Sequence, residues 1–349
     1  EDTVTMTRDQ SPTVSNAGSD QTVCSASATL AGNMPLIGTG LWTVIAGGAT
    51  VTTPGDPTSG VVNLSVGANT LVWMIGNGVC PASSDTVIIS RDESPMVANA
   101  GPDQTVCATS ATLAGNTATV GTGAWTVIAG SATVAIPGSP TSGVTGLTVG
   151  ANTFVWTISN GMCPASSDTV TITRDESPTT ANAGPDQTVC STSATLAGNP
   201  PVSGTGAWTL VGGTGTITTP GDPASGVTGL GLGANTFRWT ISNGVCTAST
   251  DDVVITREEE PTTSNAGPDQ SLCATSATLA GNTPTVGTGA WTLVSGTGTI
   301  TTAGSPTSGV TALGVGPNVF RWTITNGTCP SSTDDVTMTS DDGPKAPNA

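Results

Sequence analysis

Eight cysteines are the residues whose type and spacing most clearly indicate chemistry in this chain. They form two series in which neighbouring members lie 83 residues apart. The first series is Cys24, Cys107, Cys190 and Cys273, and the second is Cys80, Cys163, Cys246 and Cys329. The sequence has no histidine and no C-x-x-C spacing, which argues against a zinc site. Paired, evenly spaced cysteines instead favour disulfide bonds formed in an oxidising compartment.

Acidic residues offer the second possible chemistry. The chain has 24 Asp and Glu against 7 Lys and Arg, for a net charge of −17. Oxygen-rich clusters between domains suit calcium, and the weak candidates are Asp92, Glu93, Asp103, Asp175, Glu176 and Asp186. No D-x-D-x-D-G loop is present, so an anionic surface that keeps the protein soluble is the favoured interpretation. We therefore expect no cofactor.

Other classes of protein are excluded by missing residues. A Ser-His-Asp hydrolase needs histidine, and nucleic-acid binding needs clustered Lys and Arg, which this acidic chain lacks. No apolar run is long enough for a membrane helix. Isopeptide cross-links need a lysine in each domain, whereas Lys345 is the only lysine. The sequence predicts a protein that is not an enzyme, binds no nucleic acid and has no membrane span.

The whole sequence repeats every 83 residues. We predict four repeats, at 12–94, 95–177, 178–260 and 261–343. Residues 1–11 resemble the last strand of a preceding repeat, and residues 344–349 resemble the start of a following one. On this interpretation the chain is a window cut from a longer array.

The second repeat shows which elements must position the cysteines. At 152–159 the side chains of Phe154, Trp156 and Ile158 alternate with smaller ones, and a closing strand follows at 168–174. The Asn-Gly pair between them is a hairpin signal. Six or seven short antiparallel strands per repeat predict an all-β fold, a tandem array of two-sheet sandwiches.

Tryptophan recurs twice in every repeat. The inward register places these side chains in the core, which is a better interpretation than a sugar-stacking platform. The predicted core tryptophans are Trp42, Trp73, Trp125, Trp156, Trp208, Trp239, Trp291 and Trp322. Arg238, between Phe237 and Trp239, marks the solvent-facing side of its strand.

Two stretches carry a resemblance to a known family. The opening NAGPDQTVC and the later WTISNG, with their counterparts in each unit, resemble the PKD-like, immunoglobulin-like repeats of very large surface proteins in Bacteroidota. These include gliding adhesins of the SprB type. The resemblance spans all four repeats. It implies an extracellular, cell-surface location, export by the type IX secretion system, and a role as a stalk in adhesion or gliding motility.

Two schemes of disulfide pairing are open. Pairing within a repeat, for example Cys107 with Cys163, is the simpler scheme. In an immunoglobulin-like sandwich, however, the first turn and the last hairpin lie at opposite ends, too far apart for a disulfide. This favours pairing between successive repeats, as Cys24–Cys163, Cys107–Cys246 and Cys190–Cys329, with Cys80 and Cys273 pairing outside this stretch.

The function that these features predict is mechanical. We expect a stalk or filament segment of a repetitive surface adhesin, an extended rod in which each domain advances about 35–45 Å. Its partners would be neighbouring repeats, or identical chains in a filament; the surface or ligand bound is not indicated. One alternative is a set of carbohydrate-binding or spacer modules of a secreted hydrolase. Another is a filament subunit whose first strand, Thr3 to Thr7, inserts into the previous chain.

Overall fold

The computed structural model describes residues 1–341, and every regular element in that part of the chain is a β-strand. The chain divides into two compact units, one covering Glu1–Glu176 and the other beginning at Ser177. Each unit holds two of the repeats, and each repeat has seven strands.

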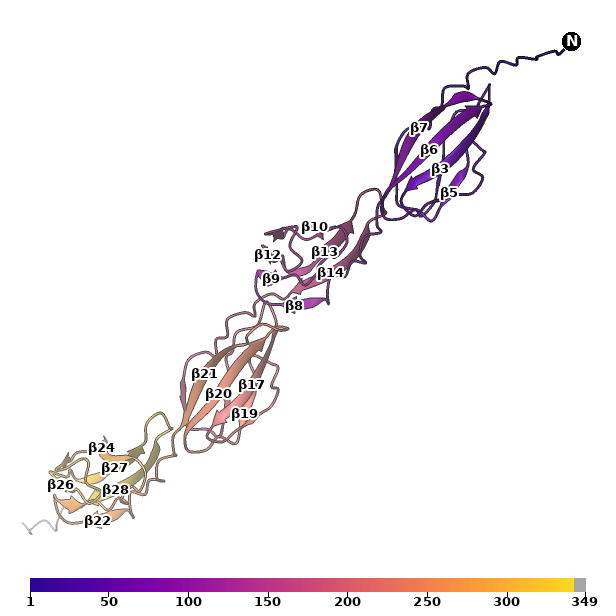
Figure 1. The fold of residues 1–349 in the computed structure, drawn as a ribbon. Coiled ribbons are helices and arrows are strands. Elements are labelled where there is room, and N and C mark those ends of the chain that lie inside the picture. Colours follow the sequence, from indigo (N-terminus) through magenta and orange to yellow (C-terminus); the bar gives the residue numbers. More distant parts are fainter. Residues whose placement is uncertain (342–349) are drawn as a thin grey trace, which may run out of the picture. The chain divides into compact units, whose positions relative to one another are not determined.

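The first unit contains the strands β1 to β14 (Figure 1). Those of the first repeat are β1 (Gln21–Val23), β2 (Ala28–Thr29), β3 (Thr39–Ala46), β4 (Thr50–Val51), β5 (Gly60–Val62), β6 (Gly67–Asn77) and β7 (Cys80–Arg91). Those of the second repeat are β8 (Gln104–Val106), β9 (Ser110–Thr112), β10 (Thr122–Ala129), β11 (Thr133–Val134), β12 (Gly143–Thr145), β13 (Gly150–Ser159) and β14 (Ser166–Arg174).

The second unit repeats the same order. The third repeat has β15 (Gln187–Val189), β16 (Ser193–Thr195), β17 (Thr205–Gly212), β18 (Thr216–Ile217), β19 (Gly226–Thr228), β20 (Gly233–Ser242) and β21 (Ser249–Arg257). The fourth repeat has β22 (Gln270–Leu272), β23 (Ala277–Thr278), β24 (Thr288–Ser295), β25 (Thr299–Ile300), β26 (Gly309–Thr311), β27 (Gly316–Thr325) and β28 (Ser332–Ser340).

Every repeat is a sandwich of a four-stranded and a three-stranded sheet. In the second repeat the larger sheet has the order β10-β13-β14-β8 and the smaller the order β11-β12-β9. The other three repeats have equivalent sheets. The two-sheet, immunoglobulin-like sandwich predicted from the strand pattern is therefore confirmed.

Each sandwich has its own hydrophobic core. The predicted inward side chains of β13 and β14 are at most 1% exposed, including Phe154, Ile158 and Ile172. All eight tryptophans are at most 3% exposed, and in the second repeat the ring centroids of Trp125 and Trp156 lie 4.9 Å apart. Indoles buried in this way cannot present a face to a sugar, so the tryptophans are core residues.

A glycine opposite the second tryptophan makes room for its indole. Gly123 on β10 lies against the ring of Trp156, and a Cβ at Gly123 would overlap that ring. The indole nitrogen of Trp156 donates a hydrogen bond to the carbonyl oxygen of Asn116 at 3.1 Å. The polar atom of this large side chain is thus satisfied inside the core.

The first strand of each repeat pairs differently from the prediction. β8 runs parallel to the closing strand β14, so the expectation of an entirely antiparallel sandwich was wrong. Two carboxylates hold this edge. Asp168 accepts a hydrogen bond from the backbone nitrogen of Ala100, and Asp103 accepts one from that of Thr171. These bonds join the segment just before β8 to β14, so side chains supplement the short backbone ladder.

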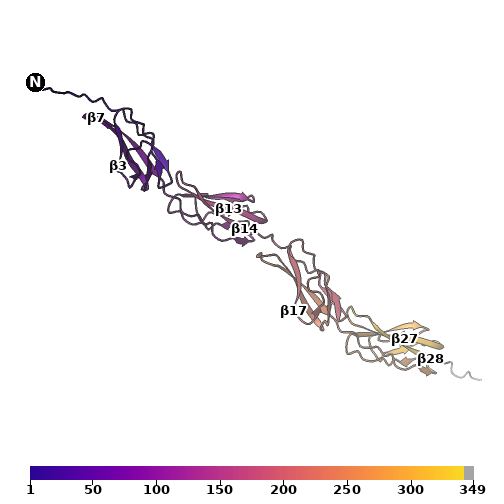
Figure 2. The ribbon, with the colours of Figure 1, turned by 90° about the vertical axis from the view of Figure 1, so that its right-hand side faces the viewer.

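The strand predicted at Thr3–Thr7 is absent, since residues 1–20 contain no strand. The N-terminal end of this segment runs away from the sandwich without a neighbouring strand (Figure 2). Val4 and Met6 are 86% and 93% exposed. No strand forms there because an isolated strand has no partner for its backbone hydrogen bonds. The assignment of 1–11 to a preceding repeat stays a prediction, and residues 344–349 lie outside the described part.

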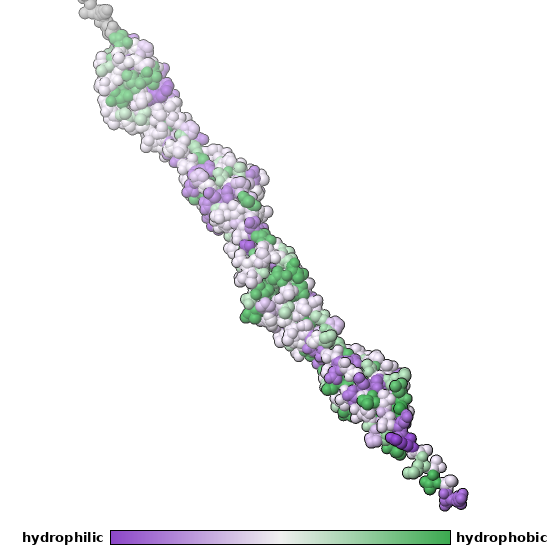
Figure 3. Space-filling view, turned by 90° about the horizontal axis from the view of Figure 1, so that it is seen from above, coloured by the Kyte–Doolittle hydropathy of each residue, from purple (hydrophilic) through white to green (hydrophobic). Residues whose placement is uncertain are grey.

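The surface is mostly pale in the hydropathy view, with scattered apolar and polar patches (Figure 3). This follows from a composition rich in glycine and poor in charge. Within residues 1–341 no helix is long and apolar enough to cross a membrane.

Candidate functional site at the joints between repeats

The two cysteines of one repeat lie at opposite ends of its sandwich. In the first repeat Cys80 opens β7, whereas Cys24 directly follows Val23, which pairs with Arg91 at the far end of β7. The 12 residues of that strand separate them by roughly 35 Å. A disulfide needs Cα atoms within about 7 Å, so the two cysteines of a repeat cannot join each other.

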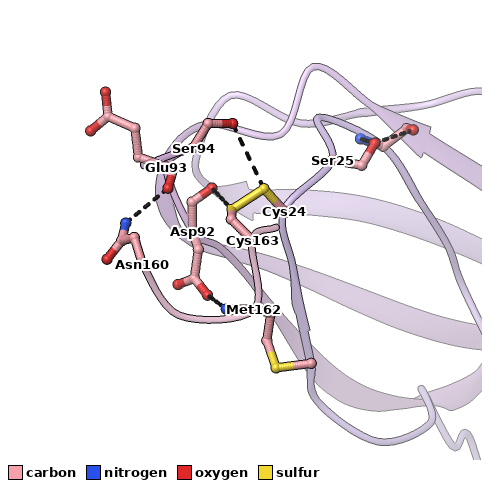
Figure 4. Close-up of a disulfide and its surroundings, with 9 residues drawn as sticks. Cys24, Ser25, Asp92, Glu93, Ser94, Asn160, Met162 and Cys163 are labelled. Atoms are coloured by element: carbon pink, nitrogen blue, oxygen red, sulfur yellow. Dashed lines mark hydrogen bonds between the residues drawn. A yellow bond between two sulfur atoms is a disulfide. The ribbon is translucent and has the colours of Figure 1, made fainter. Parts of the chain in front are cut away.

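Cys24 of the first repeat is bonded to Cys163 of the second (Figure 4). Their Cα atoms lie 4.9 Å apart, and 139 residues separate them along the chain. Cys163 is buried, and its Sγ lies 3.6 Å from the carbonyl oxygen of Asp92. This is the inter-repeat pair expected from the sequence, and it excludes Cys107 as the partner of Cys163. We call such a boundary between successive repeats a joint.

A carboxylate of the first repeat also fastens this joint. Asp92, the first residue after β7, accepts a hydrogen bond from the backbone nitrogen of Met162 at 2.7 Å (Figure 4). The next residue, Glu93, accepts one from the side-chain amide of Asn160 through its backbone oxygen at 2.8 Å. The end of one repeat is thereby hydrogen-bonded to the last hairpin of the following repeat. We call Asp92 and its equivalents the joint carboxylates.

The residue at the hairpin tip must be glycine for this contact between repeats. Gly161 has φ +52°, and a Cβ built on it would overlap the Asp92 carboxylate. The Asn-Gly pair therefore has two separate roles. It permits the left-handed turn that favours glycine, and it lets the neighbouring repeat approach the backbone closely.

The joint inside the second unit has the same parts. Cys190 is bonded to Cys329 with Cα atoms 5.0 Å apart, again across 139 residues. Here the joint carboxylate is Glu258, whose Oε2 accepts hydrogen bonds from both the backbone nitrogen and the hydroxyl of Thr328, at 2.6 and 2.9 Å. The longer side chain thus occupies the position of Asp92 and makes the same contact with backbone.

The pairing of Cys107 with Cys246 would join the two units, and it stays a prediction.

The calcium candidates do not form a site. Within the described chain no three His, Cys, Asp or Glu residues gather to hold a metal ion. The carboxylates of Asp92, Asp103 and Asp186 instead accept hydrogen bonds from backbone nitrogens. The sequence analysis did not predict that the joint carboxylates hold the hairpin of the next repeat, although an acidic residue visibly recurs after each closing strand.

Removal of a joint carboxylate should loosen the hairpin that it holds. Asp92→Ala should destabilise the hairpin locally by about 1 kcal/mol, so the amide of Met162 should exchange its hydrogen about fivefold faster. Hydrogen exchange followed by mass spectrometry measures this. Glu93→Ala is the matched control because Glu93 uses its backbone oxygen. Equal exchange at Met162 in the parent and in Asp92→Ala would show that the carboxylate does not hold the joint.

Comparison with known proteins finds only distant structural neighbours. No protein-family model and no curated protein matches the chain. Among solved structures, immunoglobulin domains 1–5 of Sidekick-1 are 11% identical, with a TM-score of 0.35, covering 95% of this chain and 81% of that one. The insect immune protein hemolin is 12% identical, with a TM-score of 0.30, covering 95% and 100%. At such values the likeness does not indicate what this chain binds.

Proposed function

We propose that this chain is a non-enzymatic structural segment of a repetitive extracellular surface protein, of the adhesin or filament type. The observation that carries the proposal is the disulfide between successive repeats, present at the joints within both units. A bond inside a domain would stabilise that domain alone. A bond across a joint instead fixes one domain to the next, which benefits a chain that transmits tension.

Several features support this role. The tryptophans fill the cores, so no aromatic platform remains on these residues for a ligand. Disulfides persist in oxidising surroundings outside the cytosol. Export by the type IX system and a role in gliding adhesion are implied by the sequence resemblance alone, and they remain part of the proposal.

Small-angle scattering tests the mechanical role. If every joint is fastened, the four repeats should behave as an extended rod with a longest dimension of roughly 140–180 Å, at about 35–45 Å per repeat. Reduction of the disulfides should leave each sandwich folded and broaden the distribution of lengths. A compact particle, or freely jointed domains in the oxidised chain, would contradict the proposal.

A further inference from the structure

The Asn-Gly pair at the last hairpin of each repeat is also the dipeptide most prone to deamidation. Asn-Gly occurs at Asn77, Asn160, Asn243 and Asn326, and each time it lies in this hairpin position. Glycine has no Cβ, so its backbone nitrogen can approach the side-chain amide carbon of the preceding asparagine. That approach is the first step of deamidation, the reaction that makes asparagine heat-labile. The hairpin signal is therefore also a candidate site of covalent modification.

The joint of the first unit holds this asparagine by its side chain and by its backbone. The Nδ2 of Asn160 donates a hydrogen bond to the backbone oxygen of Glu93 at 2.8 Å (Figure 4). The backbone oxygen of Asn160 accepts one from the backbone nitrogen of Cys163 at 3.1 Å. For deamidation the side chain must turn until its Cγ reaches the nitrogen of Gly161. The hydrogen bond to Glu93, which comes from the preceding repeat, opposes that rotation.

The second unit restrains its asparagine with equivalent contacts. The Nδ2 of Asn326 donates to the backbone oxygen of Glu259 at 2.7 Å, and the Asn326 oxygen accepts from the backbone nitrogen of Cys329 at 3.0 Å. A Cβ at Gly327 would overlap the carboxylate of Glu258. Both members of the Asn-Gly pair are thus held against the end of the preceding repeat.

We propose that Asn160 and Asn326 are sites of spontaneous deamidation, which the closed joint suppresses and an opened joint exposes. Opening of the joint frees the side-chain amide, so conversion follows. The product cannot restore the lost hydrogen bond, because an ionised carboxylate has no proton to donate to the backbone oxygen of Glu93 or Glu259. An opened joint is thereby marked irreversibly. This modification depends on the geometry of the joint and is independent of any role in transmitting tension.

The reaction consumes water and releases ammonia. The nitrogen of Gly161, after loss of its proton, attacks Cγ of Asn160, and the bond from Cγ to Nδ2 breaks as ammonia leaves with a proton. A cyclic imide results, in which the Gly161 nitrogen is bonded to both Cγ and the backbone carbonyl carbon of Asn160. Water that adds to Cγ opens the ring to aspartate. Water that adds to the backbone carbon gives isoaspartate instead, in which the main chain runs through the former side chain.

Either product disturbs the contacts of the hairpin tip. In aspartate, a carboxylate oxygen replaces the amide that donates to Glu93, so two acceptors face each other. The new charge also lies next to Gly161, against which the Asp92 carboxylate packs. In isoaspartate, the lengthened main chain shifts the nitrogen of Met162 away from Asp92, its acceptor in the joint. Each product therefore removes at least one hydrogen bond that closes the joint.

Two double variants, each of which opens one joint, test the proposal. Cys24→Ser with Asp92→Ala opens the joint of the first unit, and Cys190→Ser with Glu258→Ala opens that of the second. Both are incubated beside the parent chain at mildly alkaline pH, because the attacking nitrogen must lose its proton. Mass spectrometry after digestion quantifies the peptides that contain asparagine, aspartate and isoaspartate.

The two asparagines should respond separately. In the first double variant Asn160 should deamidate about fivefold faster than in the parent, while Asn326 keeps the parental rate. The second double variant should show the reverse, so each is the control for the other. The reduced and denatured parent supplies the rate of the unrestrained pair. Asn160→Asp, which copies one product, should exchange the amide hydrogen of Met162 about fivefold faster than the parent.

Other results would overturn the inference. Equal rates at Asn160 in the parent and in the first double variant would show that the hairpin alone restrains the pair. Faster conversion of both asparagines in one double variant would assign the protection to the whole fold and not to the joint. Exchange at Met162 that is unchanged in Asn160→Asp would show that the product leaves the joint intact.

Discussion

Stretched from its two ends without reductant, the chain should show no unfolding step that releases a whole repeat, whereas in reductant each repeat should release roughly 250 Å. The larger figure follows from about 83 residues at roughly 3.5 Å each, less a folded length of about 40 Å. With the disulfides intact, tension passes from Cys24 directly to Cys163 and from Cys190 directly to Cys329. The residues between the members of each pair carry no load and cannot lengthen the chain.

Single-molecule force spectroscopy measures these steps. The double variant Cys163→Ser with Cys329→Ser should regain long unfolding steps without reductant, because both described joints lose their bond. Cys80→Ser is the matched control, since Cys80 is also a hairpin cysteine but has no partner within the described chain. Steps of the same length in the oxidised and the reduced parent would mean that the bonds do not carry the load.

Trp239→Ala should cost about 3–5 kcal/mol of unfolding free energy. The side chain is fully buried, and its ring centroid lies 5.0 Å from that of Trp208. Its removal loses both the burial and this aromatic pair, and it leaves a cavity in a small core. Thermal or denaturant unfolding of the third repeat measures the loss.

The neighbouring Arg238→Ala is the control for that substitution and should change the unfolding free energy little. Arg238 lies on the solvent side of β20 and forms two hydrogen bonds to Asp252 at 2.7 and 2.8 Å. These bonds lower the pKa of Asp252. Both side chains are well exposed, at 42% and 38%, so water screens the pair. If Arg238→Ala were the more damaging of the two, the strand register would be wrong.

Local patterns in the sequence predicted the strands that have buried faces. Alternation identified β13 and β14 because one side of each must face the core. It could not show that β8 lies parallel to β14, since pairing direction depends on residues far away in the chain. The same limit explains why Asp92 was considered only as a weak calcium candidate or as part of an anionic surface. Asp92 was visible as an acidic residue, but its partner Met162 lies in the hairpin of the next repeat. The regular spacing of the cysteines nevertheless allowed their pairing to be predicted, because the strand order of the sandwich fixes which cysteine lies at which end of each repeat.

The buried asparagine of each repeat was missed for a related reason. Asn152 is fully buried, accepts a hydrogen bond from the Thr148 nitrogen and donates to the oxygens of Thr148, Gly150 and Ile172. In the sequence it reads as one more polar residue at the start of a strand. Its role becomes visible only when the loop before β13 folds back on it.

The placement of the two cysteines at opposite ends of a repeat also governs the order of maturation. Chains are synthesised and fold from the N-terminus, domain by domain. A newly folded first repeat cannot oxidise on itself, because Cys24 and Cys80 lie at opposite ends of β7. Cys24 must remain a thiol until the second repeat has been made and its hairpin has folded around Cys163. Closure of each bond thus requires that the next repeat has folded its hairpin, and the distance between the two cysteines of a repeat prevents them from pairing with each other.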